Sequence, residues 1–131
     1  MTKEEKVKYW IDLSDKNFHV AEDLFKLKHL LETGFFCHLT VETIFKAYFT
    51  YLIDETPPYI HKLARLAQLA DFYDDMNNDQ KDFIYNLDPF NIEARYPEYK
   101  NMLAKSLNIQ LCEDLLQKTH ELQQWIKKKI L

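Results

Sequence analysis

The chain has 131 residues, 47% of them hydrophobic and 15% aromatic, which excludes a disordered chain and is enough to bury the core of one domain. A single glycine and four prolines leave little turn chemistry for a many-stranded protein, so the composition favours helices. The 17 basic and 21 acidic residues give a net charge of -4, which does not imply the broad basic face of a general nucleic-acid-binding protein and leaves room for a local basic patch. We therefore expect a single helical domain over residues 1–131.

The first predicted helix begins directly after the N-terminus. Thr2 and Glu5 have the spacing of a capping box, in which the hydroxyl and the carboxylate accept hydrogen bonds from backbone amides at a helix start. Apolar residues then recur at helical spacing up to about residues 29–32. Thr33 and Gly34 are expected to end this helix, because glycine adopts the left-handed cap conformation at low cost.

A second helix is predicted from about Phe35 to Asp54, and the rest of the chain is organised around it. Its apolar residues recur every three or four positions, and further aromatic and aliphatic side chains surround most of its circumference. Other helices should therefore cover it on more than one side, and the first helix should run antiparallel to it because the connection is short. Most of its aromatic side chains should lie in the core, while some of them, or the surface around Trp10 or Trp125, should form a homodimer interface.

Two prolines mark the end of the long helix. Pro57 and Pro58 cannot donate backbone hydrogen bonds and bias their neighbours away from helix, so the chain should turn there. A third helix is predicted at about residues 59–73. The polar stretch that follows, 74–79, is rich in helix-capping residue types and should be a loop into a fourth helix at about 79–87.

The segment 89–106 has no clean period over its first half and contains Pro97, which predicts a long loop with one helical turn. Loops of this length in small domains are often functional. The last helix should start at about Asn108. The expected fold is all-α, an up-and-down helical bundle of four main helices plus a shorter fifth.

Several short motifs, in this order, resemble the HEPN domain family. They are Gly34-Phe35-Phe36, the run from Cys37 to Ala47, the turn Pro57-Pro58, the tripeptide His61-Lys62-Leu63 and the tripeptide Arg95-Tyr96-Pro97. Many relatives carry Gln-Ala-x-Glu-Lys-x-x-Lys in the long helix. This chain keeps Glu42 and Lys46 but has His38 and Thr43 in place of the glutamine and the first lysine. The resemblance spans nearly the whole chain and implies a HEPN-like bundle that usually dimerises and is associated with nucleotide or RNA chemistry.

Arg95 and Tyr96 are the first candidates for ligand binding. The arginine guanidinium is a planar fork of donors suited to phosphate, and the tyrosine ring could stack on a base. In the alternative interpretation, Arg95 clamps helix ends or pairs with Glu93 or Glu98. Replacing Arg95 with alanine should weaken nucleotide binding and leave the helical circular dichroism signal intact.

His61 and Lys46 are the other two candidate ligand-binding residues. His61 follows the proline turn, where it could carry a proton near neutral pH or hydrogen-bond the turn; no acid or second histidine at a telling spacing supports the first role. Lys46 could approach a phosphate if its helix face meets a cleft. The simpler account is a local ion pair, because Glu42 precedes it by four residues in the favourable order.

Catalytic and metal motifs are missing from the sequence. HEPN toxins that cleave RNA resemble one another in an Arg-x4-6-His motif, but neither Arg65 nor Arg95 is followed by a histidine at that spacing. Because general acid–base cleavage needs a positioned proton carrier, we expect no metal-independent nuclease activity. The chain has no glycine-rich phosphate loop and no paired Cys/His spacing, and its acidic residues at 71–79 lack the ligand spacing of a calcium loop, so no metal and no cofactor are expected.

The cysteines and the N-terminus indicate a cellular compartment. Cys37 and Cys112 fall inside predicted helices without metal spacing, which favours buried thiols in a reducing cytosol over a disulfide. The charged start of the chain lacks the apolar run of a signal peptide, and no window approaches the ~18 apolar residues of a membrane span. We expect a cytoplasmic protein without membrane association.

Taken with the resemblance, these observations predict a non-catalytic nucleotide- or RNA-associated binding and interaction module. The resemblance further implies pairing with a small nucleotidyltransferase in a toxin–antitoxin-like or accessory unit. Two alternatives stay open. The first is a divergent ribonuclease toxin that combines Arg95 with a histidine from another position, His61 or His120. The second is a purely structural dimer that scaffolds a partner protein.

Overall fold

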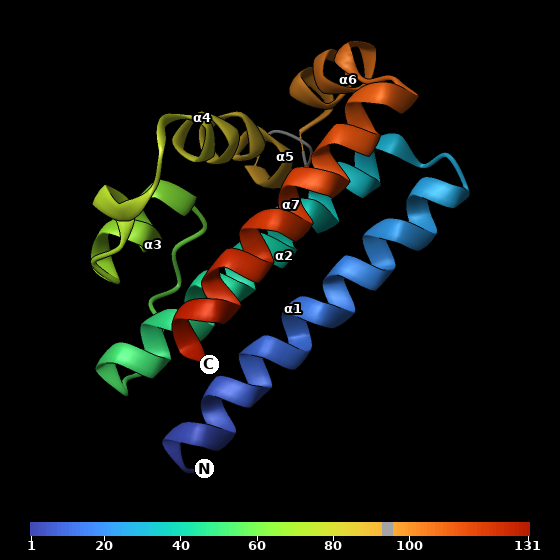
Figure 1. The fold of residues 1–131 in the computed structure, drawn as a ribbon. Coiled ribbons are helices and arrows are strands. Elements are labelled where there is room, and N and C mark those ends of the chain that lie inside the picture. Colours follow the sequence, from blue (N-terminus) through green and yellow to red (C-terminus); the bar gives the residue numbers. More distant parts are fainter. Residues whose placement is uncertain (93–95) are drawn as a thin grey trace.

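The computed structural model describes residues 1–92 and 96–131, and these form an all-α fold (Figure 1). The helices are α1 (Lys3–Lys26), α2 (Leu30–Ile53), α3 (Leu63–Leu69), α4 (Asn78–Leu87), α5 (Pro89–Ile92), α6 (Pro97–Ser106) and α7 (Ile109–Ile130), and a 3-10 turn lies at Tyr73–Asp75. Among the residues described, none of the helices combines the length and the apolar character that a membrane crossing requires. The predicted all-α class is confirmed.

Three long helices, α1, α2 and α7, form the body of the molecule. Figure 1 shows α1 running antiparallel to α2, while α7 runs in the same direction as α2, so that both chain termini lie at one end. The short helices α3 to α6 carry the chain back to the opposite end before α7 begins. The described chain therefore has three helices of more than twenty residues and several short ones, rather than the expected four main helices plus a shorter fifth.

The central position of α2 follows from its sequence. Its buried residues include Val41, Ile44 and Phe45 on successive turns, and α1, α3, α5 and α7 all pack on it. The expectation that other helices cover α2 on more than one side is therefore met. Ser14 of α1 and Gln123 of α7 add a buried polar contact: the amide of Gln123 donates to the Ser14 hydroxyl, which donates to a backbone carbonyl of α2.

The turn between the first two helices lies earlier than predicted. α1 ends at Lys26, and Lys28 takes the left-handed conformation (φ 63°) that was expected of Gly34. Gly34 instead lies inside α2, where the ring of Phe90 packs against its Cα. A side chain at position 34 would collide with that ring. The glycine is therefore required by close packing and not by a helix cap.

Two further segment predictions were wrong for local reasons. Residues 59–62 are not helical, and α3 begins only at Leu63. The backbone N–H of Leu63 donates a hydrogen bond to the carboxylate of Asp88, which fixes the start of the helix there. Residues 97–106 form α6 instead of a loop. Pro97 occupies the first helical turn, where its missing N–H costs no hydrogen bond and its fixed φ favours the helix.

Both cysteines are free and buried, as predicted. Burial raises the pKa of Cys37 to about 12 and the pKa of Cys112 to about 11, so both thiols stay protonated near neutral pH. Because the thiolate is the reactive form, an alkylating reagent at pH 8 should label less than about a tenth of the thiols in the native protein and all of them in denaturant. Mass spectrometry of labelled samples measures both, and complete labelling of the native protein would contradict the prediction.

Candidate functional site

A buried ion pair on α2 forms the base of the candidate site. Lys46 Nζ donates to Glu42 Oε2 at 3.0 Å, and both side chains are almost fully buried. The two residues are four apart, which places them on one face of the helix, as the sequence predicted. The burial was not expected. The Lys46 ammonium also lies 5.7 Å from the centre of the Trp10 ring on α1, which gives the cation a second favourable contact.

Glu42 also fixes His61, which lies in the loop between α2 and α3. His61 Nδ1 is 3.1 Å from Glu42 Oε1. Since the carboxylate can only accept, the proton of this hydrogen bond belongs to Nδ1. His61 Nε2 has no hydrogen bond to any residue in the described part of the chain, and the side chain is 49% exposed. The imidazole is thus held from behind by a buried carboxylate and presents its other edge to solvent.

A second histidine and a second carboxylate complete the cluster. His38 is fully buried on α2, with Nε2 3.1 Å from Asp88 Oδ1 and Nδ1 3.6 Å from Glu42 Oε1. Asp88, at the end of α4, also accepts the backbone N–H of Leu63 at 3.2 Å. We call these five side chains the Glu42 cluster: His38, Glu42, Lys46, His61 and Asp88. The cluster ties α2, the α2–α3 loop, the start of α3 and the end of α4 to one another.

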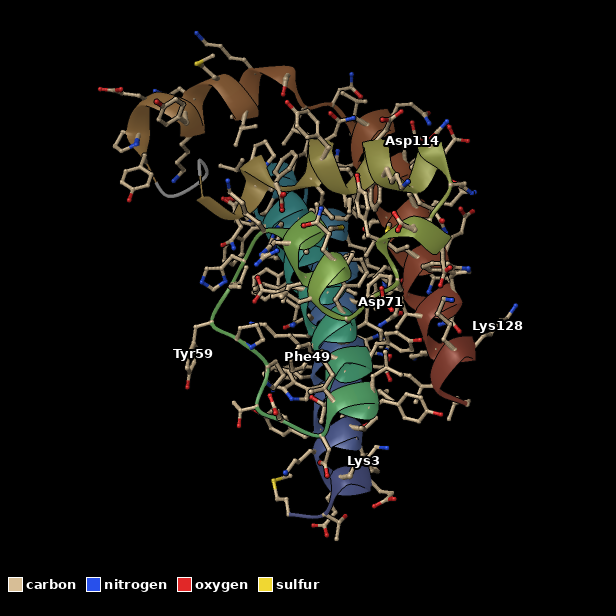
Figure 2. The ribbon with its side chains drawn as sticks, turned by 90° about the vertical axis from the view of Figure 1, so that its left-hand side faces the viewer. Lys3, Phe49, Tyr59, Asp71, Asp114 and Lys128 are labelled. Atoms are coloured by element: carbon tan, nitrogen blue, oxygen red, sulfur yellow. The ribbon has the colours of Figure 1, made fainter. Side chains whose placement is uncertain are left out.

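The anchored loop presents three different side chains to solvent. Tyr59 is 93% exposed, and His61 and Lys62 are also exposed. Figure 2 shows Tyr59 projecting from the loop, away from the helices. Pro57 and Leu63 are buried and hold the two ends of this stretch against the body of the protein. We call residues 57–62 the His61 loop; it offers an aromatic ring, an imidazole and an ammonium on one short, anchored segment.

The four residues proposed from the sequence occupy different environments. His61 is half-exposed on Glu42, and Lys46 is buried against the same carboxylate, so the fold brings these two together. Tyr96 is the N-cap residue of α6 and is 58% exposed. Arg95 lies outside the described residues. Sequence reasoning did not identify Tyr59, and it did not assign His38 or Asp88 to a site.

The spacing of the cluster explains why it was missed. His38 and Glu42 are one helical turn apart, which is a detectable signal, but His61 and Asp88 reach them only through the tertiary fold. Among the residues that the structure describes, no three His, Cys, Asp or Glu side chains converge to hold a metal ion. The described site offers hydrogen-bond donors, an exposed aromatic ring and an imidazole, the side chain that most often carries a proton near neutral pH.

Comparison with known proteins identifies the family. The HEPN domain model matches residues 7–130, which is nearly the whole chain and includes all of the Glu42 cluster and the His61 loop. Neither the comparison with curated proteins nor that with solved structures gave a match. The family is all-α, in agreement with the observed fold. The chain therefore belongs to the HEPN domain family, which comprises helical modules related to nucleotides and RNA.

Proposed function

We propose that this protein is a non-catalytic module that binds a nucleotide or RNA at the His61 loop. The observation that carries the proposal is the anchoring of His61 by the buried Glu42, which orients the imidazole on the same short loop as Tyr59, a residue that is 93% exposed. A base can stack on the tyrosine, since stacking on an aromatic ring tolerates every base. His61 and the exposed Lys62 supply donors for a phosphate next to it.

Tyr96 and Arg95 extend the proposal to a second segment. Tyr96 is exposed at the start of α6 and can offer another stacking surface. The guanidinium of Arg95 remains our candidate for bidentate contact with a phosphate. Lys46 acts indirectly, because it is buried and its charge is neutralised by Glu42. Its role is to hold the Glu42 carboxylate in place as the acceptor for His61.

The proposal predicts which substitutions weaken binding. A nucleotide or short RNA that binds the native protein raises its melting temperature, and replacing His61 or Tyr59 with alanine should weaken that binding about fivefold, since each removes one stacking or hydrogen-bonding contact. Matched controls are His19→Ala and Tyr85→Ala, which remove an exposed histidine of α1 and an exposed tyrosine of α4. The measurement is a thermal-shift titration against a panel of nucleotides and oligoribonucleotides. Equal shifts in all four variants and the wild type would remove the His61 loop from the site.

One observation favours a second candidate function. A half-exposed histidine backed by a carboxylate is also the arrangement of a general base, so His61 and Glu42 could serve a divergent ribonuclease in combination with Arg95. Incubating the purified protein with labelled RNA in the presence of EDTA tests this function. Cleavage that disappears in His61→Ala and persists in His19→Ala would replace the non-catalytic assignment by the nuclease.

The assembly and the cellular context belong to the same proposal. We place the module in the cytoplasm as a homodimer that is accessory to a small nucleotidyltransferase in a toxin–antitoxin-like unit. Exposed apolar side chains at the end of α2, Leu52 and Ile53, and on α6, Tyr99 and Met102, support a protein interface. Two free buried thiols support a reducing compartment. Sedimentation of the purified protein, alone and after co-expression with a nucleotidyltransferase encoded beside it, tests both partners.

A further inference from the structure

A groove lies between α4 and the first half of α7, away from the His61 loop. α7 packs mainly on α2, whereas α4 packs on α3 and α5, and the space left between α4 and α7 encloses about 800 Å³. Figure 2 shows Asp114, on the α7 side of this groove, well separated from Tyr59 of the His61 loop. Of the described residues proposed above for nucleotide binding, Tyr59, His61, Lys62 and Tyr96, none lines the groove.

The floor of the groove is apolar. Phe83, Phe90 and Leu122 form its buried part, and Leu107 and Leu115 are half-buried above them. Leu111 is 44% exposed at the upper end of α7. The apolar surface that the described chain leaves uncovered in the groove therefore belongs mainly to Leu107, Leu111 and Leu115. Burial of such surface by a partner yields about 25 cal/mol for each Å² removed from water.

The walls of the groove are acidic. Asp79 and Asp82 stand on the α4 side, Asp114 and Glu121 on the α7 side, and Lys118 is the single cation among the described lining residues. None of the four carboxylates forms an ion pair within the part of the chain that the structure describes. Asp79 is also favoured by its place in the first turn of α4. Asp114 and Glu121 each accept a hydrogen bond from a glutamine one turn earlier on α7, which leaves their negative charge uncompensated. This surface repels the phosphates of a nucleic acid.

The spacing of the carboxylates indicates an extended ligand. Asp114 and Glu121 are seven residues apart on α7, which separates them by two turns, about 10 Å along the helix axis. The lining residues of α7 run from Leu111 to Leu122, about three turns of helix. A small cation needs converging carboxylates, and no cluster of three potential metal-ligand side chains occurs among the described residues. A helix with an apolar stripe and basic residues at matching intervals complements both the floor and the walls.

We infer that the groove between α4 and α7 is a docking site for a cationic amphipathic helix of a partner protein. The leucine-rich floor receives the apolar stripe of that helix, and its lysine or arginine side chains pair with the carboxylates of both walls. This inference does not rest on nucleotide binding, because the groove and the His61 loop share no residue. The protein thereby has one surface for a nucleotide or RNA and a second, of opposite electrostatic character, for a protein.

A pair of synthetic peptides tests the inference. The first is a helix of about four turns with a leucine stripe flanked by lysines, and the second carries glutamate in place of every lysine. Fluorescence anisotropy with the full chain should show saturable binding of the lysine peptide and none of the glutamate peptide. Amide shifts of the labelled protein in NMR spectra should then concentrate on α4 and α7. Failure of the lysine peptide to bind, or equal binding of both peptides, would overturn the inference.

Charge reversals on neighbouring positions separate docking from general attraction. Asp82→Lys and Asp114→Lys should each weaken binding of the lysine peptide about tenfold, because each introduces repulsion at a wall of the groove. Glu113→Lys is the matched control, since Glu113 is exposed on the same helix beside Asp114 but does not line the groove. It should change the affinity by less than about twofold. An equal loss in Glu113→Lys would show attraction by net charge alone and overturn the inference.

Discussion

Replacing Glu42 with glutamine is expected to lower the free energy of unfolding by about 3–5 kcal/mol, because the substitution leaves the ammonium of Lys46 buried without its counter-ion. Glutamine keeps the shape of the side chain, so the loss reports the charge and not a cavity. Urea unfolding followed by circular dichroism measures the effect. The loop should loosen at the same time, since the carboxylate also holds His61.

Two controls separate the buried pair from ordinary ion pairing. The double variant Glu42→Gln, Lys46→Met should recover most of the lost stability, because an apolar side chain replaces the unpaired charge. On α1, Lys8 and Asp12 form an exposed pair at the same four-residue spacing, and Asp12→Asn should cost less than about 1 kcal/mol. A loss as small as this in Glu42→Gln would mean that solvent reaches Lys46, and the anchoring of His61 would lose its physical basis.

Local signals in the sequence predicted much of the fold. The capping box of Thr2 and Glu5 starts α1, and both of its hydrogen bonds are present. Asn108 is the N-cap residue of α7, at the position expected for the last helix. These signals work because a cap satisfies backbone amides within a few residues, so no distant part of the chain is needed to specify it.

Residues with more than one structural use were misinterpreted. Proline stops a helix in its interior but favours it in the first turn, and Pro97 has the second use at the start of α6. Glycine serves both in left-handed caps and at close contacts, and Gly34 has the second use. The sequence alone does not distinguish these uses, because the deciding neighbour of Gly34 is Phe90, far along the chain.

Only the part of the candidate site that lies within one helix was predictable from the sequence. The pair of Glu42 and Lys46 is local to one helix and was recognised as such. The contact of Glu42 with His61 crosses the proline turn, and that of His38 with Asp88 joins α2 to the end of α4. No spacing rule specifies such contacts, since they depend on how α3 and α4 return to α2. The sequence therefore supplied candidate residues, and the fold supplied their arrangement.

Gly34→Ala is expected to destabilise the protein, although alanine is the better helix former. An added Cβ would lie 2.6 Å from Cε1 of Phe90 and still closer to Cδ1, so the ring, which is 6% exposed, would have to shift. Overpacking of this kind costs up to about 3 kcal/mol. The gain in helix propensity offsets about 1 kcal/mol. The free energy of unfolding, measured in urea, should therefore fall by about 2 kcal/mol.

A double-mutant cycle with Phe90→Ala isolates the contact. Once the ring is removed, Gly34→Ala should stabilise the protein by up to about 1 kcal/mol, so the sign of the substitution reverses. Stabilisation by Gly34→Ala in the wild-type background would show that the ring yields freely. The contact matters for the site as well, because Gly34 and His38 are one turn apart on α2 and face Phe90 and Asp88, which are two residues apart. The absence of a side chain at position 34 thus lets α5 approach α2 closely enough for Asp88 to reach His38.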